Sequence, residues 1–180
     1  MRKIFFFLGA AVFITSCNNE AAKDETTGGD TAMAKTEVPL PYTPSYSSAF
    51  KMGNSEYSAM ILQGSWKDWE MNTMDNMKSW VADTVTVYHS DNTMVKGIDS
   101  LTARWKRGRA KYSAVSTTID AVMPVYSTDK NENWVLVWAT EVDTKLDGKK
   151  DTSSVMETWR INKDNKADLL YQFDRANRKQ

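Results

Sequence analysis

The chain has 180 residues, with 23 lysines and arginines against 23 aspartates and glutamates, one histidine and one cysteine. This balance of charge gives no electrostatic basis for nucleic-acid binding. One cysteine excludes an internal disulfide, and one histidine without clustered carboxylates gives no basis for a metal site. The sequence contains no phosphate loop, Rossmann fingerprint or nucleophile elbow, so we expect no cofactor.

The N-terminus has the layout of an export signal. Arg2 and Lys3 precede an apolar run from Ile4 to Ile14, and Thr15-Ser16-Cys17 follows it. The run is shorter than the roughly 20 residues needed to span a bilayer, which indicates a segment that is removed. The segment resembles a bacterial lipoprotein signal peptide, whose cysteine is lipidated and becomes the first mature residue. An ordinary secretory signal with an incidental cysteine is the alternative.

This resemblance implies a lipid anchor at Cys17 and a place in the cell envelope after loss of residues 1–16. Asn18 stands where an aspartate would favour the inner membrane in some bacteria, so the outer membrane is the expected location. Residues 17–53 are polar and then proline-rich, which predicts a disordered tether. One globular domain is expected over residues 54–178.

The domain begins with helical patterns. Apolar residues recur at helical spacing after Asn54, and a second short helix is predicted from Thr73 to Trp80. Alternation of β-branched residues then predicts a strand over residues 84–89, and Gly97 precedes a third helix that carries Trp105.

Four strands are predicted after the third helix, over residues 113–126, 134–146, 152–161 and 167–174, with short polar turns between them. The pattern contains no βαβ alternation, so a parallel sheet is not expected. We therefore predict an α+β fold in which three N-terminal helices pack on a curved antiparallel β-sheet.

The order and spacing of these segments resemble the nuclear transport factor 2-like superfamily, in particular its SnoaL-like and ketosteroid-isomerase-like members. The residues that carry the resemblance are Trp69 followed by Asp75, the run 82–89, Gly97-Ile98-Asp99 and Tyr171-Gln172-Phe173-Asp174. The resemblance implies a cone with an apolar pocket, a scaffold that hosts isomerases, cyclases, dehydratases and proteins without known activity. Many members are homodimers.

Strand pairing across the turn at residues 147–150 predicts which side chains share a face. With Leu146 placed near Asp151, Trp138 lies opposite Trp159 and Thr140 opposite Glu157. One face is then aromatic and should lie under the helices. The other face is charged and is a candidate homodimer surface, with these members: Glu141, Asp143, Arg160, Asp168, Gln172 and Asp174.

Three residues are candidates for proton transfer. Glu157 falls on the apolar face, where burial would raise its pKa and suit it to act as a general acid or base. Pairing at the sheet rim with Arg104, Arg107 or a helix-end amide is the structural alternative. His89 could transfer a proton or orient a ligand carbonyl, or be an ordinary turn residue. Asp120 could join Glu157 if a bulge near Pro124 turned it inward.

Aromatic side chains are the candidates for ligand contact, although core packing explains most tryptophans at this spacing. The candidate ligand-binding residues are Trp66, Trp69, Trp105, Trp138, Trp159, Tyr171 and Phe173. Three hypotheses follow: a lipid-anchored module that binds a small apolar molecule without catalysis, an isomerase or cyclase that uses a pocket carboxylate with His89, and a homodimeric interaction domain.

Overall fold

The computed structural model describes residues 39–176. Its helical part begins with one continuous helix made of α1 (Ser55–Ile61), the π-helical turn η1 (Leu62–Lys67) and α2 (Asp68–Met71). Asn54 caps this helix by accepting the Glu56 backbone N–H at 2.9 Å, as short polar side chains do at helix N-termini. The helix ends at Asn72, which has a left-handed conformation with φ of 58°.

Two further helical segments follow. The 3₁₀ turn η2 (Met74–Asn76) runs into α3 (Met77–Trp80), and α4 (Ile98–Arg109) comes after Gly97. Gly97 has φ of 83°, a backbone conformation that side chains with a Cβ rarely adopt. The three predicted helices are therefore present.

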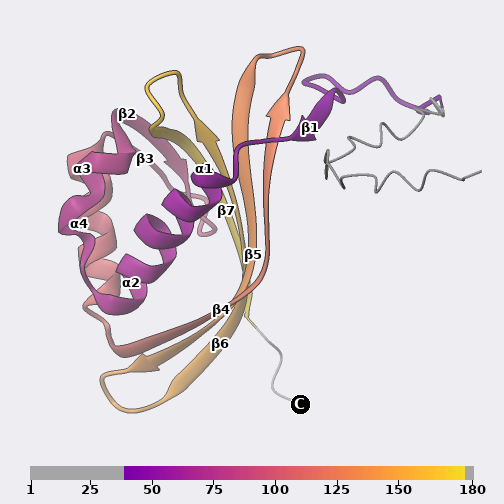
Figure 1. Cartoon of the computed structure of the whole chain (residues 1–180). Helices are drawn as coiled ribbons and strands as arrows, with labels where there is room; N and C mark the ends of the chain where they lie inside the picture. Colours follow the sequence, from indigo (N-terminus) through magenta and orange to yellow (C-terminus); the bar gives the residue numbers. More distant parts are fainter. Residues whose placement is uncertain (1–38, 177–180) are drawn as a thin grey trace, which may run out of the picture. The chain divides into compact units, whose positions relative to one another are not determined.

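Within residues 39–176, seven strands form one open sheet with the order β1-β4-β5-β6-β7-β2-β3. The strands are β1 (Phe50–Met52), β2 (Val81–Tyr88), β3 (Met94–Lys96), β4 (Tyr112–Ser127), β5 (Glu132–Lys145), β6 (Lys150–Ile161) and β7 (Ala167–Ala176). Figure 1 shows that the long strands β4 to β6 bend strongly and that the helices lie on the concave side. The mixed α+β architecture with a curved sheet is thus confirmed.

The sheet is not entirely antiparallel, because β2 and β7 pair in parallel with Val87 beside Leu170. The expectation of a purely antiparallel sheet fails at this one pair. Most of the domain lies between β2 and β7 in the chain. No short hairpin therefore forces these two strands to run in opposite directions.

The predicted register between β5 and β6 is wrong by three residues. Trp138 lies opposite Met156, and Trp159 lies opposite Val135. Because side chains alternate between the two faces of a strand, an odd shift moves every β5 side chain to the other face. The inner face of β5, toward the helices, therefore carries Val135, Val137, Ala139, Glu141 and Asp143.

The core lies between this inner face and the helices. Trp159 is fully buried, and its ring packs edge-on against Trp80 at 5.5 Å and against Trp105 at 6.2 Å between ring centroids. Edge-to-face packing at these distances is favourable for aromatic pairs. These contacts join α3 and α4 to β6 through large buried side chains.

The folded chain begins before residue 54, so the predicted tether boundary at residue 53 lies too far along the chain. β1 pairs with the end of β4, where Phe50 lies beside Ser127. Before β1, Ser47 donates to Asp129 at 2.6 Å, and the Tyr46 ring packs edge-on against Trp134 at 6.1 Å. No apolar periodicity marks this segment, because one short strand buries little surface.

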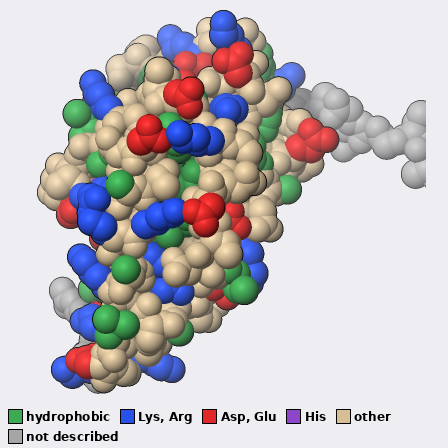
Figure 2. Space-filling model, turned by 90° about the vertical axis from the view of Figure 1, so that its left-hand side faces the viewer, with side chains coloured by type: hydrophobic (Ala, Val, Ile, Leu, Met, Phe, Trp, Pro, Cys, Tyr) green, Lys and Arg blue, Asp and Glu red, His purple; other side chains and the backbone are tan. Residues whose placement is uncertain are grey.

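The helix-bearing surface is polar. Figure 2 looks onto the side that lies at the left of Figure 1 and shows acidic and basic side chains mixed over it, with hydrophobic side chains only in small separate patches. No helix within residues 39–176 is long and apolar enough to cross a membrane.

Candidate functional site

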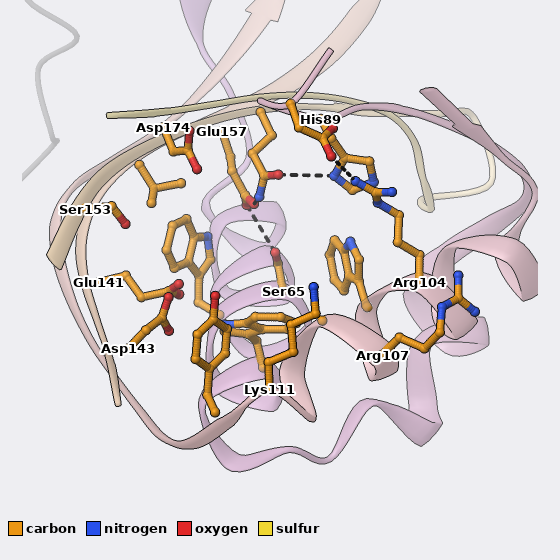
Figure 3. A pocket seen from close by; sticks show the side chains of 18 residues that line it. Ser65, His89, Arg104, Arg107, Lys111, Glu141, Asp143, Ser153, Glu157 and Asp174 are labelled. Carbon is orange, nitrogen blue, oxygen red and sulfur yellow. Dashed lines mark hydrogen bonds and ion pairs between the residues drawn. The ribbon is translucent and has the colours of Figure 1, made fainter. Parts of the chain in front are cut away.

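A pocket of about 560 Å³ lies between the inner face of the sheet and the helices (Figure 3). Its lining comes from η1, α2, α4 and strands β4 to β7, so every layer of the domain contributes. The volume falls within the roughly 300–1,000 Å³ typical of small-molecule sites. The tryptophans that line it are Trp66, Trp69 and Trp105.

Glu157 is the most deeply buried charged residue of the pocket, with 3% of its surface exposed. Its carboxylate accepts hydrogen bonds from Ser65 Oγ at 3.1 Å, Trp159 Nε1 at 2.8 Å and Gln172 Nε2 at 3.1 Å. Burial raises the pKa of Glu157, and these donors oppose the rise because they favour the ionised form. The prediction that Glu157 is a buried carboxylate among aromatic side chains is confirmed.

The structural alternative for Glu157 was pairing at the sheet rim with Arg104, Arg107 or a helix-end amide. Glu157 forms no ion pair with Arg104, Arg107 or any other basic residue in the described part of the chain. Its negative charge is instead shared among three uncharged donors. That arrangement satisfies the carboxylate without a counter-ion, as buried polar groups require.

His89 lies directly after β2 and is 9% exposed. Its Nδ1 is 3.2 Å from Gln172 Oε1, so Gln172 links His89 to Glu157. The pKa of His89 is lowered mainly by burial, and the nearby Arg104 adds to this because it disfavours a second positive charge. Nε2 of His89 is buried and has no hydrogen-bond partner among residues 39–176.

Glu141 and Asp143 form an acidic pair on the inner face of β5, and Figure 3 shows their side chains close together. Burial and repulsion by Asp143 and Glu157 raise the pKa of Glu141 to about 8. The pKa of Asp143 is also raised, mainly by burial. The pair therefore holds a proton more readily than isolated carboxylates do, as closely spaced acids in low dielectric surroundings must.

The predicted pairing of β5 with β6 places Glu141 and Asp143 on the opposite face, so these two pocket residues were not expected. A separate error in the predicted pairing of β6 with β7 misplaced Gln172 and Asp174, which also line the pocket. The pairing shifts by one residue between Arg160 and Ile161, so Trp159 lies opposite Leu170 and Glu157 opposite Gln172. The signal that could have found Glu141 and Asp143 is Gly148, whose φ of 82° marks the turn around which β5 and β6 pair. A turn fixed there would have given the observed register.

Basic side chains occupy the opposite wall of the pocket. Arg104, Arg107 and Lys111 come from α4 and the turn after it. Arg104 Nη2 pairs with Asp91 Oδ2 at 2.7 Å, whereas Arg107 and Lys111 take part in no salt bridge within the described residues. The expected apolar pocket is therefore mixed, with an aromatic part between an acidic sheet wall and a basic helix wall.

The remaining sequence candidates lie elsewhere. Trp159 belongs to the core and reaches the pocket only through its hydrogen bond to Glu157. Trp138, Tyr171 and Phe173 point to the outer face of the sheet because of the register. Asp120 is exposed, accepts a hydrogen bond from Thr140 Oγ1 at 3.1 Å and does not line the pocket.

The N-terminal segment was compared with known families. Residues 1–18 match the model of the prokaryotic membrane lipoprotein lipid attachment site. This match includes Cys17, the predicted lipidation residue, which lies outside the described residues. A comparison with curated proteins found no match.

Solved structures resemble the domain. A protein assigned as a SnoaL-like polyketide cyclase from Shewanella denitrificans is 11% identical, with a TM-score of 0.56 and coverage of 68% of this chain and 92% of that one. A nuclear transport factor 2-like protein of unknown function from Burkholderia pseudomallei is 15% identical, with a TM-score of 0.54 and coverage of 69% and 92%.

An epoxide hydrolase of the LEH-like type from M. tuberculosis has a TM-score of 0.53 at 11% identity and covers 67% of this chain and 84% of its own. At such identities the likeness concerns the fold and not the activity. The chain thus joins the N-terminal lipid attachment sequence of a prokaryotic membrane lipoprotein to a domain with the nuclear transport factor 2-like fold.

Proposed function

We propose that this protein is anchored in the bacterial outer membrane through a lipid on Cys17 and that its domain binds a small molecule in the pocket without changing it. The single observation that carries the binding proposal is the pocket of about 560 Å³ with three tryptophans in its lining. Concave sites of this size with aromatic walls and a few placed polar groups are the usual form of small-molecule sites.

The lining also refines the ligand class. Trp66, Trp69 and Trp105 offer ring faces and edges to an apolar or aromatic body. The acidic and basic walls favour a ligand that also carries polar groups, since a purely apolar molecule would leave those side chains desolvated. We therefore propose an amphipathic ligand with an apolar body.

The binding proposal is tested with 2-naphthol as the probe. It is titrated by calorimetry into the mature chain without the lipidated Cys17, which begins at Asn18. Val155 lines the pocket, so Val155→Trp should fill it and weaken binding by at least about tenfold. Met156→Trp, on the outer face one residue further along, is the matched control and should leave affinity unchanged. Equal affinities in both variants would place the probe elsewhere and contradict the proposal.

An enzyme of the proton-transfer type is the second candidate, and the buried connection between Glu157 and His89 favours it. A neutral His89 could accept a proton through Nε2 while Glu157 holds the amide of Gln172 in place. The test measures exchange of the α-protons of 2-tetralone with D₂O. The enzyme hypothesis expects exchange above the buffer rate that is lost in His89→Ala, and equal rates would refute it.

The anchor is tested separately by mass spectrometry of the mature N-terminus and by membrane fractionation. Lipidated Cys17 should add the mass of acyl chains, and Cys17→Ser should release the protein from the membrane fraction. An unmodified cysteine in the mature protein would refute the anchor.

A homodimer is the third candidate, now through the aromatic outer face of the sheet instead of a charged one. Tyr88 and Tyr171 stack there with ring centroids 5.1 Å apart, and Phe173 is 59% exposed. Exposed apolar clusters of this kind are typical of interaction surfaces. Sedimentation equilibrium should then return twice the mass of the chain, and a monomer at high micromolar concentration would refute it.

A further inference from the structure

The three hydrogen bonds to Glu157 have directions that chemistry fixes. An ionised carboxylate only accepts, and the Trp159 indole N–H only donates. Trp159 Nε1 and Ser65 Oγ both donate to Oε2, at 2.8 Å and 3.1 Å. Oε1 is left for Gln172, whose amide nitrogen donates to it at 3.1 Å. An ionised Glu157 therefore accepts from all three donors, whereas a proton on Oε1 would set an O–H donor against the Gln172 amide N–H.

The orientation of Gln172 follows from this. Because its NH₂ group faces Glu157, its carbonyl oxygen faces the other way, toward Nδ1 of His89 at 3.2 Å. An amide oxygen only accepts, so Nδ1 must carry a proton. In a neutral imidazole the other nitrogen then has no proton and can only accept. Glu157 thus acts on His89 through Gln172 and is a positioning residue.

We propose that the Glu157–Gln172 pair holds His89 in the tautomer protonated on Nδ1, so that Nε2 is a fixed acceptor for a hydroxyl or N–H group of the pocket ligand. The ligand part of this inference rests on the proposed binding function. The ligand class is then an apolar or aromatic body that carries a hydrogen-bond donor. Ethers and hydrocarbons of the same shape lack this donor and fall outside the class.

The lack of a hydrogen-bond partner for Nε2 among the described residues supports a ligand as its partner. Nε2 is buried and has no hydrogen-bond partner within residues 39–176, although His89 belongs to the pocket lining. A buried acceptor without a donor raises the free energy of the folded state, so such acceptors are rare in native proteins. A donor supplied by a bound molecule would complete the site.

The charged groups around His89 are compatible with a neutral ring. Arg104 from α4 and Asp91 from the loop after β2 form an ion pair beside it, and Glu157 acts from β6 through the amide of Gln172 (Figure 3). The Arg104 charge disfavours protonation of Nε2. The Arg104 side chain is 33% exposed, so its long stem can move aside to admit a ligand group.

His89 is the only histidine of the chain, which makes the test direct. Long-range ¹H–¹⁵N spectra of the mature chain from Asn18, labelled in histidine, report which ring nitrogen carries the proton. We expect Nδ1–H in the wild type and a shift toward Nε2–H in Gln172→Met, which lacks the accepting oxygen. Phe173→Met, on the outer face next to it, is the control and should keep Nδ1–H. Nε2–H in the wild type would overturn the inference.

The ligand part is tested with 2-naphthol and 2-methoxynaphthalene, which differ in the donor. The inference expects 2-naphthol to bind about fivefold more tightly, to shift the Nε2 resonance, and to lose this advantage in Gln172→Met. Equal binding of both probes with an unperturbed Nε2 would overturn the donor requirement and leave pocket binding intact. Failure of both probes to bind would overturn the pocket function itself and the ligand part with it, whereas the tautomer result would stand.

Discussion

The two faces of the sheet carry different chemistry within the same strands. On the inner face, β5 and β6 present Glu141, Asp143 and Glu157 to the pocket. On the outer face, the same strands and β7 carry large apolar side chains among polar ones, with Trp138 partly buried and Phe173 exposed. A side chain and its next neighbour in sequence therefore meet opposite surroundings.

This difference shows that residue type alone does not identify the core side of a sheet that encloses a pocket. A sheet with a filled core would place its aromatics inside and its acids outside. Here the pocket takes the place of part of the core, so acids can lie on the inner face, and three side-chain donors satisfy Glu157 there. Three predictions test whether the two faces differ in energy as well as in composition.

The largest effect on stability is expected for Trp159. It is compared with Trp138, which the predicted register placed opposite it. Trp159 is fully buried, and Trp159→Ala should lower the free energy of unfolding by about 3–5 kcal/mol, since it leaves a cavity and removes a donor to Glu157. Trp138→Ala on the outer face should cost under about 2 kcal/mol. Urea unfolding measures both, and equal losses would show that the two faces are energetically alike.

A smaller effect on stability is expected from Glu141 on the inner face. The pKa of Glu141 is raised to about 8, so the folded state holds its proton more tightly than the unfolded state. Stability then falls as the pH rises from the ordinary carboxyl pKa of about 4.3 toward the folded value, with a slope of at most about 1.4 kcal/mol per pH unit.

Glu141→Gln should remove this loss and stabilise the protein by about 1–2 kcal/mol at pH 8, with little change at pH 4. Urea unfolding at several pH values provides the measurement. Asp120→Asn, at an exposed position outside the pocket, serves as the matched control and should keep the wild-type slope. An unchanged slope in Glu141→Gln would mean that the inner face is well solvated.

The smallest effect on stability is expected on the outer face. Phe173 is 59% exposed, so Phe173→Asp should change the free energy of unfolding by less than about 1 kcal/mol. If two copies pair through this face, the same change should shift sedimentation from dimer to monomer, because a buried unpaired carboxylate opposes association. Retention of the dimer would place the interface elsewhere.

The helices and strands could be predicted because they depend on local periodicity. The alternation over residues 84–88 and the helical spacing around Leu101 and Trp105 gave β2 and α4 close to their observed positions. The parallel pairing of β2 with β7 could not be predicted in this way, since it joins segments that are distant in sequence and depends on the packing of the whole domain.

The site was predicted in part. Glu157 was identified because a carboxylate beside Trp159 in a strand is unusual on a buried face, and His89 because it follows β2. Their connection through Gln172 was not visible, since the predicted pairing of β6 with β7 lacked the shift between Arg160 and Ile161 and so turned Gln172 outward. Asp120 was proposed for the pocket through a bulge, and the bulge that the structure places between Ile119 and Ala121 leaves Asp120 exposed.

The sequence by itself determined the N-terminal attachment segment and most of the helices and strands. The N-terminal segment through Cys17 matches a lipid attachment site, and the periodic segments set the helices and strands. Tertiary structure decided which face of the sheet meets the helices and hence which carboxylates line the pocket. The physical reason is that strand alternation fixes two faces but not their surroundings, which depend on a register that a shift of one residue reverses.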